Sequence, residues 1–314
     1  MNSNELIREK QRLWATRNGI QLRTDKYSCS HSPYPDQNVF KGLSESTKKW
    51  FMNADGHELE MKDGYPPKMT AVYSSSALCV NVFQYFIDKK DNPELSSALF
   101  QSCKLIGQTD KLEVANMQFE CTKYPIKIGD NTISTPNIDL VAELTYGTNK
   151  RHIIAESKFT EPYSGSHNNF ISRKYYTNKD LWTSLDLLDL YKALNIDNID
   201  ETKYNTSKGI EIGKCVFSYK YLDATQLLKH LLGASCAFKK DKSNIRLVYL
   251  WYDAWGTEGA CLRDEIEKFR QIVEDNTPIK FRHITYQELI VNLWNKLNYN
   301  EHSEYLNYIA DRYL

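Results

Sequence analysis

The fold is decided by residues 136–159, which read PNIDLVAELTYGTNKRHIIAESKF. Two apolar runs rich in β-branched residues, 137–145 and 152–159, flank a Gly-Thr-Asn turn signal at 147–149. Strands of this length with such a short connection pair with each other in an antiparallel hairpin. The segment therefore predicts a β-hairpin.

The turn also determines which side chains face each other. If the hairpin is centred on the Gly-Thr step, residues whose numbers sum to 295 are opposite, so Asp139 lies opposite Glu156. Side chains alternate along a strand, so Glu156 and Lys158 point to one face and Ser157 to the other. The sequence thus predicts two carboxylates and an ammonium on one half-buried face of a sheet.

This cluster suits the hydrolysis of phosphodiesters. Ionised groups on apolar strands cost stability unless they neutralise one another or hold a cation. Paired carboxylates bind a hard divalent cation such as Mg²⁺, which polarises the phosphate and lowers the pKa of bound water. Lys158 would orient this water and stabilise developing charge. Glu120, at the end of a predicted strand over 112–121, is the expected third acid, and Glu113 is a weaker candidate.

The same residues also have a purely structural interpretation. Asp139 and Lys158 would then form a cross-strand ion pair, and Glu156 would be a solvated residue on an open sheet face. An acid two residues before a lysine also occurs at three other places in the chain, so this spacing alone does not decide between the two interpretations.

The flanking sequence continues the pattern of a sheet covered by helices. Later strands are predicted at 245–252 and 279–284. Helical periodicity is present at residues 4–16, 74–86, 94–105, 179–194, 222–238, 258–274 and 286–297. We expect a mixed α/β fold, with a central mixed sheet of four or more strands flanked by helices.

The first 70 residues differ from the rest of the chain. After the helix at 4–16, residues 20–70 are irregular and are punctuated by Ser-Pro-Tyr-Pro at 32–35 and Gly-Tyr-Pro-Pro at 64–67. We expect residues 1–70 to form a helix and an irregular region packed on the core, and residues 71–314 to form the main domain.

Composition excludes several classes of protein. The 314 residues contain 40 Lys and Arg and 40 Asp and Glu, so the chain is not a basic or acidic tail. With 41% hydrophobic residues it is not disordered. No apolar run approaches the roughly 18 residues of a membrane span, and the start lacks the features of a secretory signal. We expect a soluble, cytoplasmic protein.

Other common sites find no support in the sequence. The seven cysteines contain no C-x-x-C pair and the seven histidines no metal-binding spacing, so we expect buried, reduced thiols rather than a zinc site. Phosphate-binding glycine loops and the G-x-S-x-G hydrolase elbow are also absent from the sequence. A thiol hydrolase using Cys79 or Cys236 is a distant alternative, because no histidine is placed near either in a recognisable pattern.

With these residues in view, the chain resembles the PD-(D/E)XK nuclease superfamily. Pro136 to Asp139, followed by Glu156-Ser157-Lys158, looks like its signature, and the order of helices and strands resembles its core. The proline stands two residues further from Asp139 than expected, and Lys229 stands where an arginine is expected. Segments that look like a bacterial family of restriction endonuclease-like proteins span about 70–314, at 74–83, 119–120, 156–161, 226–230, 305–306 and 312–313.

The resemblance implies a restriction-endonuclease-like core and roles for named residues. Lys158 would be the catalytic lysine, and Gln226 would face the site and help hold the metal-bound water or the phosphate. The cofactor would be Mg²⁺, and Mn²⁺ would be able to replace it. The metal ligands would be Asp139, Glu156, Glu120 and the carbonyl of Ser157.

DNA is the implied partner, and cutting it requires positive surface to neutralise phosphates. The candidate contacts are Lys150 and Arg151, expected in the turn beside the site, with Arg173, Lys174 and Lys229. Palindromic cutting would favour a homodimer, and a restriction–modification system would supply a partner methyltransferase.

The sequence therefore favours a Mg²⁺-dependent endodeoxyribonuclease that serves restriction or defence. Two alternatives remain open. One is a repair or recombination nuclease on the same site, and the other is a catalytically silent DNA-binding or interaction module that keeps the fold.

Overall fold

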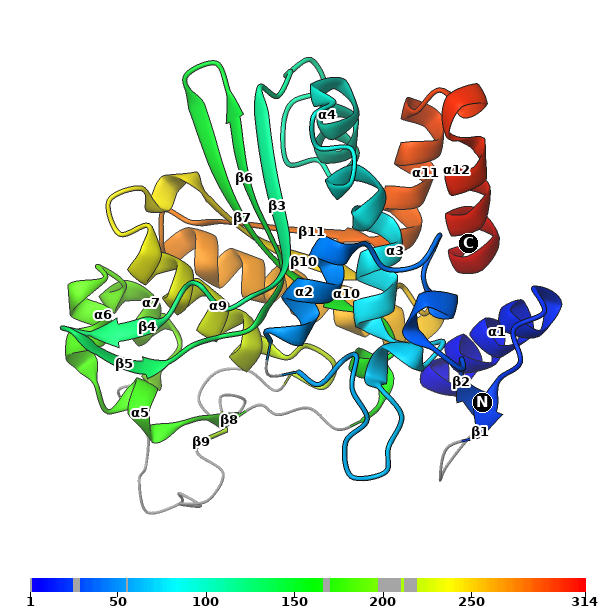
Figure 1. The fold of residues 1–314 in the computed structure, drawn as a ribbon. Coiled ribbons are helices and arrows are strands. Elements are labelled where there is room, and N and C mark those ends of the chain that lie inside the picture. Colours follow the sequence, from blue (N-terminus) through cyan, green and yellow to red (C-terminus); the bar gives the residue numbers. More distant parts are fainter. Residues whose placement is uncertain (1, 25–28, 55, 166–169, 197–209, 212–218) are drawn as a thin grey trace.

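The hairpin predicted from residues 136–159 forms the middle of a five-stranded sheet of order β11-β10-β7-β6-β3 (Figure 1). The computed structural model describes residues 2–314 except 25–28, 55, 166–169, 197–209 and 212–218. β6 pairs antiparallel with β3 and with β7, whereas β10 runs parallel to both β7 and β11. The five strands are β3 (Val114–Cys121), β6 (Ile138–Tyr146), β7 (Asn149–Lys158), β10 (Ile245–Trp251) and β11 (Lys280–Thr285).

The mixed α/β fold and all five of these strands were predicted correctly, and so was the register of the hairpin. The paired residues run from Leu140 opposite Ala155 to Tyr146 opposite Asn149, and each pair sums to 295. The register follows from the two-residue turn, because a slip of one residue would move every apolar side chain to the other face.

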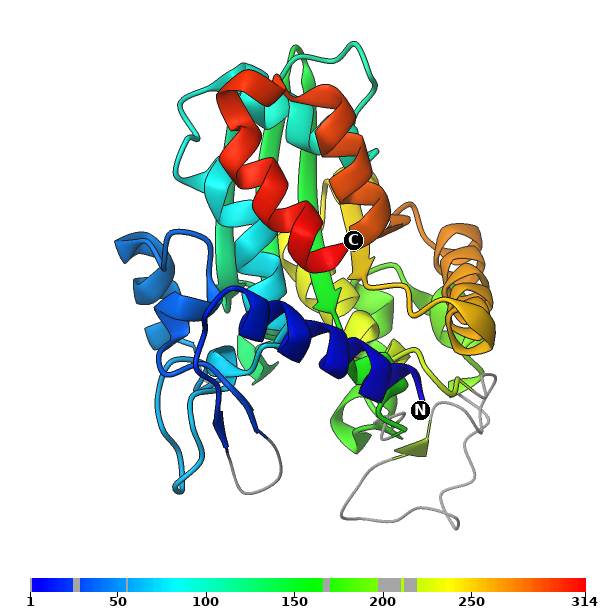
Figure 2. The same cartoon turned by 90° about the vertical axis from the view of Figure 1, so that its right-hand side faces the viewer.

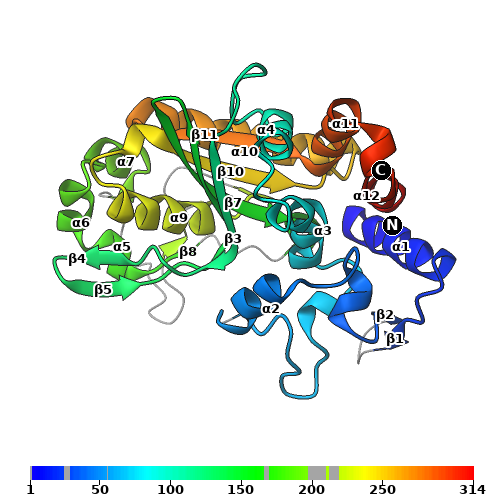
Figure 3. The ribbon, with the colours of Figure 1, turned by 45° about the horizontal axis from the view of Figure 1, so that its top comes forward.

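Helices cover both faces of this sheet (Figure 3). α7, α9 and α10 lie on one face, and α3, α4 and α11 lie on the other. The helices are α1 (Ser3–Arg17), α2 (Glu45–Met52), α3 (Ser75–Ile87), α4 (Pro93–Ser102), α5 (Arg173–Tyr176), α6 (Lys179–Ser184), α7 (Leu188–Ala193), α9 (Ala224–Ala237), α10 (Gly256–Asn276), α11 (Tyr286–Lys296) and α12 (Tyr299–Tyr313).

Several elements differ from the sequence prediction. The helix expected over 179–194 is two short helices, α6 and α7, because Asp186 between them adopts a left-handed conformation with φ of 53°. α2, α5 and α12 were not predicted, and neither were the small antiparallel pairs. These are β1 (Arg23–Thr24) with β2 (Cys29–His31), β4 (Ile126–Ile128) with β5 (Asn131–Ser134), and β8 (Phe170–Ile171) with β9 (Ile210–Glu211).

The N-terminal helix α1 lies against the C-terminal helix α12 (Figure 2). The fully buried guanidinium of Arg312 joins them, because its Nε donates to Gln11 Oε1 at 3.1 Å. Its other N–H groups donate to the carbonyl and side-chain oxygens of Asn38, to the Val72 carbonyl and to the Tyr308 hydroxyl. All of these acceptors are neutral, so a buried cation holds α1 and the irregular N-terminal region on the core.

Candidate functional site

Three acidic residues lie in one row across neighbouring strands. On β3 and β6, Phe119 pairs with Leu140 and Cys121 with Ile138, which places Glu120 opposite Asp139. The register of β6 and β7 places Asp139 in turn opposite Glu156. Opposite residues share a face of the sheet, and the charges of the three predicted carboxylates act on one another across this row.

Asp139 begins the row at the start of β6. Its Oδ2 accepts a hydrogen bond from the Ser157 backbone N–H at 2.7 Å, where main-chain pairing of the two strands has ended. Burial, reinforced by the charge of Glu156, raises the pKa of Asp139 well above its ordinary value. A negative charge on this carboxyl is therefore costly unless a cation lies nearby.

Glu156 is fully buried and contacts two polar side chains. Its Oε1 forms an ion pair with Lys158, and its Oε2 lies 2.6 Å from His230 Nε2 on α9. Lys158 Nζ also donates to Gln226 Oε1 at 2.9 Å. The structural interpretation, in which Glu156 was solvated, is therefore wrong, whereas Glu156 and Lys158 do point to the same face, as predicted.

The opposite charges of Glu156 and Lys158 stabilise each other. Burial alone would raise the pKa of Glu156, but Lys158 and the hydrogen bond from His230 hold it below the ordinary value. Burial likewise opposes the charge on Lys158, yet the carboxylates of Glu156 and Asp139 raise its pKa. The site thus contains a buried ammonium that stays charged beside a carboxylate that stays ionised.

Glu120 combines burial with backbone strain. Its φ is 48°, a left-handed value that costs a non-glycine residue about 1–3 kcal/mol and is common at functional sites. Asn137 Nδ2 donates to its Oε2. Burial, together with the nearby carboxylates of Glu58 and Glu156, raises its pKa to about 7.

This raised pKa predicts how pH changes stability. Folded Glu120 keeps its proton up to about pH 7, whereas the unfolded residue loses it near 4.5, so stability falls as pH rises through this window. In EDTA, Glu120→Gln is expected to raise Tm at pH 8 by about 2–4 °C and to leave it nearly unchanged at pH 5. Thermal melts at both pH values test this, with exposed Glu143→Gln as the control. An equal shift at both pH values would contradict the prediction.

The backbone N–H and C=O groups of Ser157 point toward Asp139 and the end of β6. Its N–H donates to Asp139, and the N–H and C=O of one strand residue point toward the same neighbouring strand. The Lys158 carbonyl points the other way and accepts from Tyr252 N at 3.0 Å. The Ser157 carbonyl is therefore directed toward the end of β6, while its side chain lies on the opposite face, 2.7 Å from the Tyr286 hydroxyl.

These oxygen donors fit a hard divalent cation such as Mg²⁺. In the described part of the chain, no three His, Cys, Asp or Glu side chains are arranged as a complete metal site. Mg²⁺ does not require one, because it binds through one or two carboxylates and takes its other ligands from water and substrate phosphate. Asp139 and Glu156, with the Ser157 carbonyl beside them, provide such a partial set.

Two residues of this site were missed in the sequence. His230 stands four residues after Gln226, so both lie on one face of α9, and this spacing was the available signal. Glu58 comes from the irregular N-terminal region and forms an ion pair with Lys68 at 3.6 Å. It influences the pKa of Glu120, yet nothing in its local sequence indicates this role.

The candidate DNA contacts are only partly near the acids. Lys150 and Arg151 are the second and third residues of β7, six and five residues before Glu156, which is about 17–20 Å at roughly 3.3 Å per residue. The prediction that they lie beside the acids is therefore wrong. Glu113 lies at the same distant end, where its Oε1 accepts from Gly147 N. Lys229 is on α9 beside His230.

The other two predicted cations are on α5. Lys174 donates to the Ile133 carbonyl at 2.9 Å, which ties α5 to β5. The side chain of Arg173 lies outside the described part of the structure.

The thiol alternative has little physical support. Cys79 is buried in α3, Cys236 is partly buried, and burial raises the pKa of both thiols. A thiolate is the reactive form of cysteine, so both thiols are held in the unreactive form.

In comparisons with known proteins, residues 8–314 match the family model described as "Restriction Endonuclease associating with ARP". Comparisons with curated proteins and with solved structures gave no match. Among the described residues, no helix has the length and apolar character needed to cross a membrane.

Proposed function

The chain belongs to the family of restriction endonucleases associating with ARP, and we propose that it is a Mg²⁺-dependent endonuclease that hydrolyses phosphodiester bonds in DNA. The observation that carries the proposal is the row of Asp139 and Glu156 with Lys158 bonded to Glu156. Hard anionic oxygens beside a buried ammonium suit a reaction that develops negative charge on phosphate oxygens.

Asp139, Glu156 and the Ser157 carbonyl would hold the cation, and Glu120 would complete the acidic cluster. When bound, Mg²⁺ polarises the phosphate and lowers the pKa of its water. Lys158 would donate hydrogen bonds to the attacking water or to the phosphate, because Gln226 and Glu156 fix its ammonium. His230 would hold Glu156 in place.

The biological setting is part of the proposal. A restriction or defence role is supported by the family, and a two-fold homodimer would cut both strands of a palindromic site. In a restriction–modification system, a partner methyltransferase would protect host DNA. A repair or recombination nuclease would use the same residues and would produce nicks or end-dependent products.

Cleavage of plasmid and linear duplex DNA by purified protein tests the proposal. We expect products in Mg²⁺ and Mn²⁺ and none in EDTA, and discrete bands would indicate sequence-specific restriction. DNA binding without metal-dependent products, by protein shown to be folded, would favour the catalytically silent module instead.

A further inference from the structure

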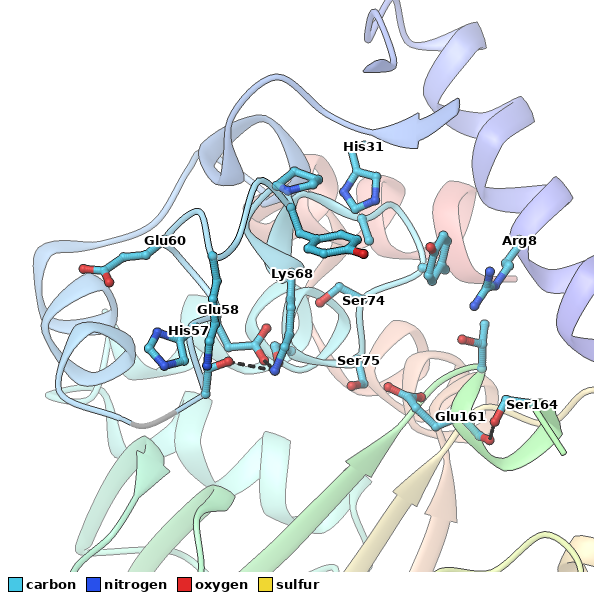
Figure 4. A pocket seen from close by; sticks show the side chains of 18 of the residues that line it. Arg8, His31, His57, Glu58, Glu60, Lys68, Ser74, Ser75, Glu161 and Ser164 are labelled. Carbon is cyan, nitrogen blue, oxygen red and sulfur yellow. Dashed lines mark hydrogen bonds and ion pairs between the residues drawn. The ribbon is translucent and has the colours of Figure 1, made fainter. Parts of the chain in front are cut away.

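A pocket of about 730 Å³, shown in Figure 4, lies next to Glu120 at one end of the acidic row. Its walls come from α1, from the irregular segment around Glu58 and Lys68, from the start of α3, and from the turn after β7. Three of its lining residues are near the site. Glu58 influences Glu120, Thr160 follows Lys158 by two residues, and a Cβ built on Gly56 would lie 3.7 Å from Glu120 Oε2. The pocket therefore adjoins the Glu120 end of the acidic row, although the carboxylates themselves do not line it.

Arg8 stands in this wall without a counter-ion. Its guanidinium stacks over the ring of Tyr73 at 3.9 Å, and its Nε is shielded from solvent and has no hydrogen-bond partner. Within the described residues, no ion pair or hydrogen bond engages its other nitrogens. A half-buried guanidinium with its planar edge unused is suited to a bidentate anion such as a phosphate.

The position of Arg8 is fixed by its own helix. Asn4, one turn earlier on the same face, donates to the Thr160 carbonyl at 2.9 Å, and Gln11 is bonded to Arg312. Residues at positions i, i+4 and i+7 share a helix face, so these buried contacts direct Arg8 toward the pocket. The cation is held in place before any ligand arrives, which reduces the entropy lost on binding.

We infer that this pocket binds the substrate strand next to the cleaved bond, with Arg8 on one phosphate of that strand. The inference rests on the proposed function and names a contact within it. A strand that leaves the carboxylates along the turn after β7 enters the pocket at Thr160. Ser74 and Ser75, at the start of α3, line the same pocket and offer hydroxyl groups to the same strand (Figure 4).

The acidic residues of the pocket do not oppose this arrangement. Figure 4 shows Glu58 and Glu60 on the side away from Arg8. Glu58 is paired with Lys68, and exposed Glu60 is screened by salt. Glu161 turns back to accept a hydrogen bond from Phe159 N at 2.8 Å. Asp63 also lines the pocket, and Figure 4 shows Glu161 as the labelled acid on the Arg8 side, where its carboxylate is already engaged by the Phe159 N–H.

A double-mutant cycle, which combines the substitution of Arg8 with the removal of one phosphate charge from the DNA, tests the inference. Duplexes carry a single neutral methylphosphonate at successive positions around the mapped cut, and their Kd values are measured without catalytic metal. For the wild type, one position is expected to weaken binding about tenfold. Arg8→Met, which keeps the apolar stem over Tyr73, is expected to weaken the unmodified duplex about tenfold and to abolish the effect of that position. The slope of log Kd against the logarithm of salt concentration should be smaller by about 0.9 for this variant than for the wild type.

Arg12→Met is the matched control, because Arg12 lies on the same helix and is already paired with Glu9. It should behave as wild type in every assay, and Arg8→Lys should restore part of the affinity. Thermal melts establish that each variant is folded. Equal Kd values and slopes for Arg8→Met and Arg12→Met would overturn the inference, and so would weaker binding that couples to no phosphate position.

Failure of the Arg8 contact can be told apart from failure of the proposed nuclease. If the wild type neither binds nor cuts DNA, the proposed function fails, and the Arg8 contact fails with it. If inorganic phosphate raises the Tm of the wild type but not of Arg8→Met, while both bind DNA equally, the pocket holds a free anion and the strand contact is wrong. If the wild type cuts DNA and Arg8→Met binds DNA as tightly as the wild type, the Arg8 contact is wrong and the proposed nuclease function stands.

Discussion

Glu156→Gln is expected to reduce Mg²⁺-dependent cleavage of duplex DNA by about a thousandfold or more. Glutamine preserves the size of the buried side chain and can still accept a hydrogen bond from His230 or Lys158. It removes the charge that would hold the cation and that raises the pKa of Lys158. The variant should therefore fold and bind DNA but fail in the metal-dependent step.

Single-turnover cleavage rates in a Mg²⁺ titration measure this effect. Glu143→Gln is the matched control, because Glu143 is on the neighbouring strand β6 and is exposed to solvent. It should cleave at the wild-type rate. Full activity of a folded Glu156→Gln variant would exclude Glu156 as a metal ligand and move the reaction to another part of the protein.

Arg312→Met is expected to lower the free energy of unfolding by about 3–5 kcal/mol. The guanidinium is fully buried, and methionine would leave Gln11 Oε1, Asn38 Oδ1 and the Val72 carbonyl without a donor. At about 2–4 °C per kcal/mol, Tm should fall by roughly 10 °C. Denaturant unfolding and thermal melts measure both quantities.

Arg12→Met serves as the control here too, because an exposed ion pair on one helix contributes less than about 1 kcal/mol. A loss of similar size in both variants would show that the buried hydrogen bonds of Arg312 add nothing specific.

The strands and their register were predictable because they depend on local patterns. Alternation and a short turn determine the pairing of β6 with β7, and this pairing places Asp139 opposite Glu156. Counting along the strand should also have placed Lys150 correctly, since six residues of extended chain separate it from Glu156. That error came from treating nearness in sequence as nearness to the site.

The remaining site residues depend on packing between distant segments. His230 lies 74 positions from Glu156, and only the packing of α9 on the sheet brings the two side chains together. Glu58 belongs to a segment without periodicity, so no pattern indicates where its side chain points. The left-handed backbone of Glu120 is likewise a result of tertiary structure, because its local sequence reads as an ordinary strand.

The bonds of Arg312 also set an order of events during synthesis. Arg312 lies 274 positions after Asn38, its main partner. At about 5–20 residues per second, the ribosome takes roughly 14–55 s to make the chain between them. Throughout that interval the irregular N-terminal region lacks its buried anchor, and α1, which carries Arg8, lacks its contact with α12. The helix that carries Arg8 therefore gains this anchor only once Arg312 has been made, so the proposed contact of Arg8 with a phosphate is preorganised only from that point on.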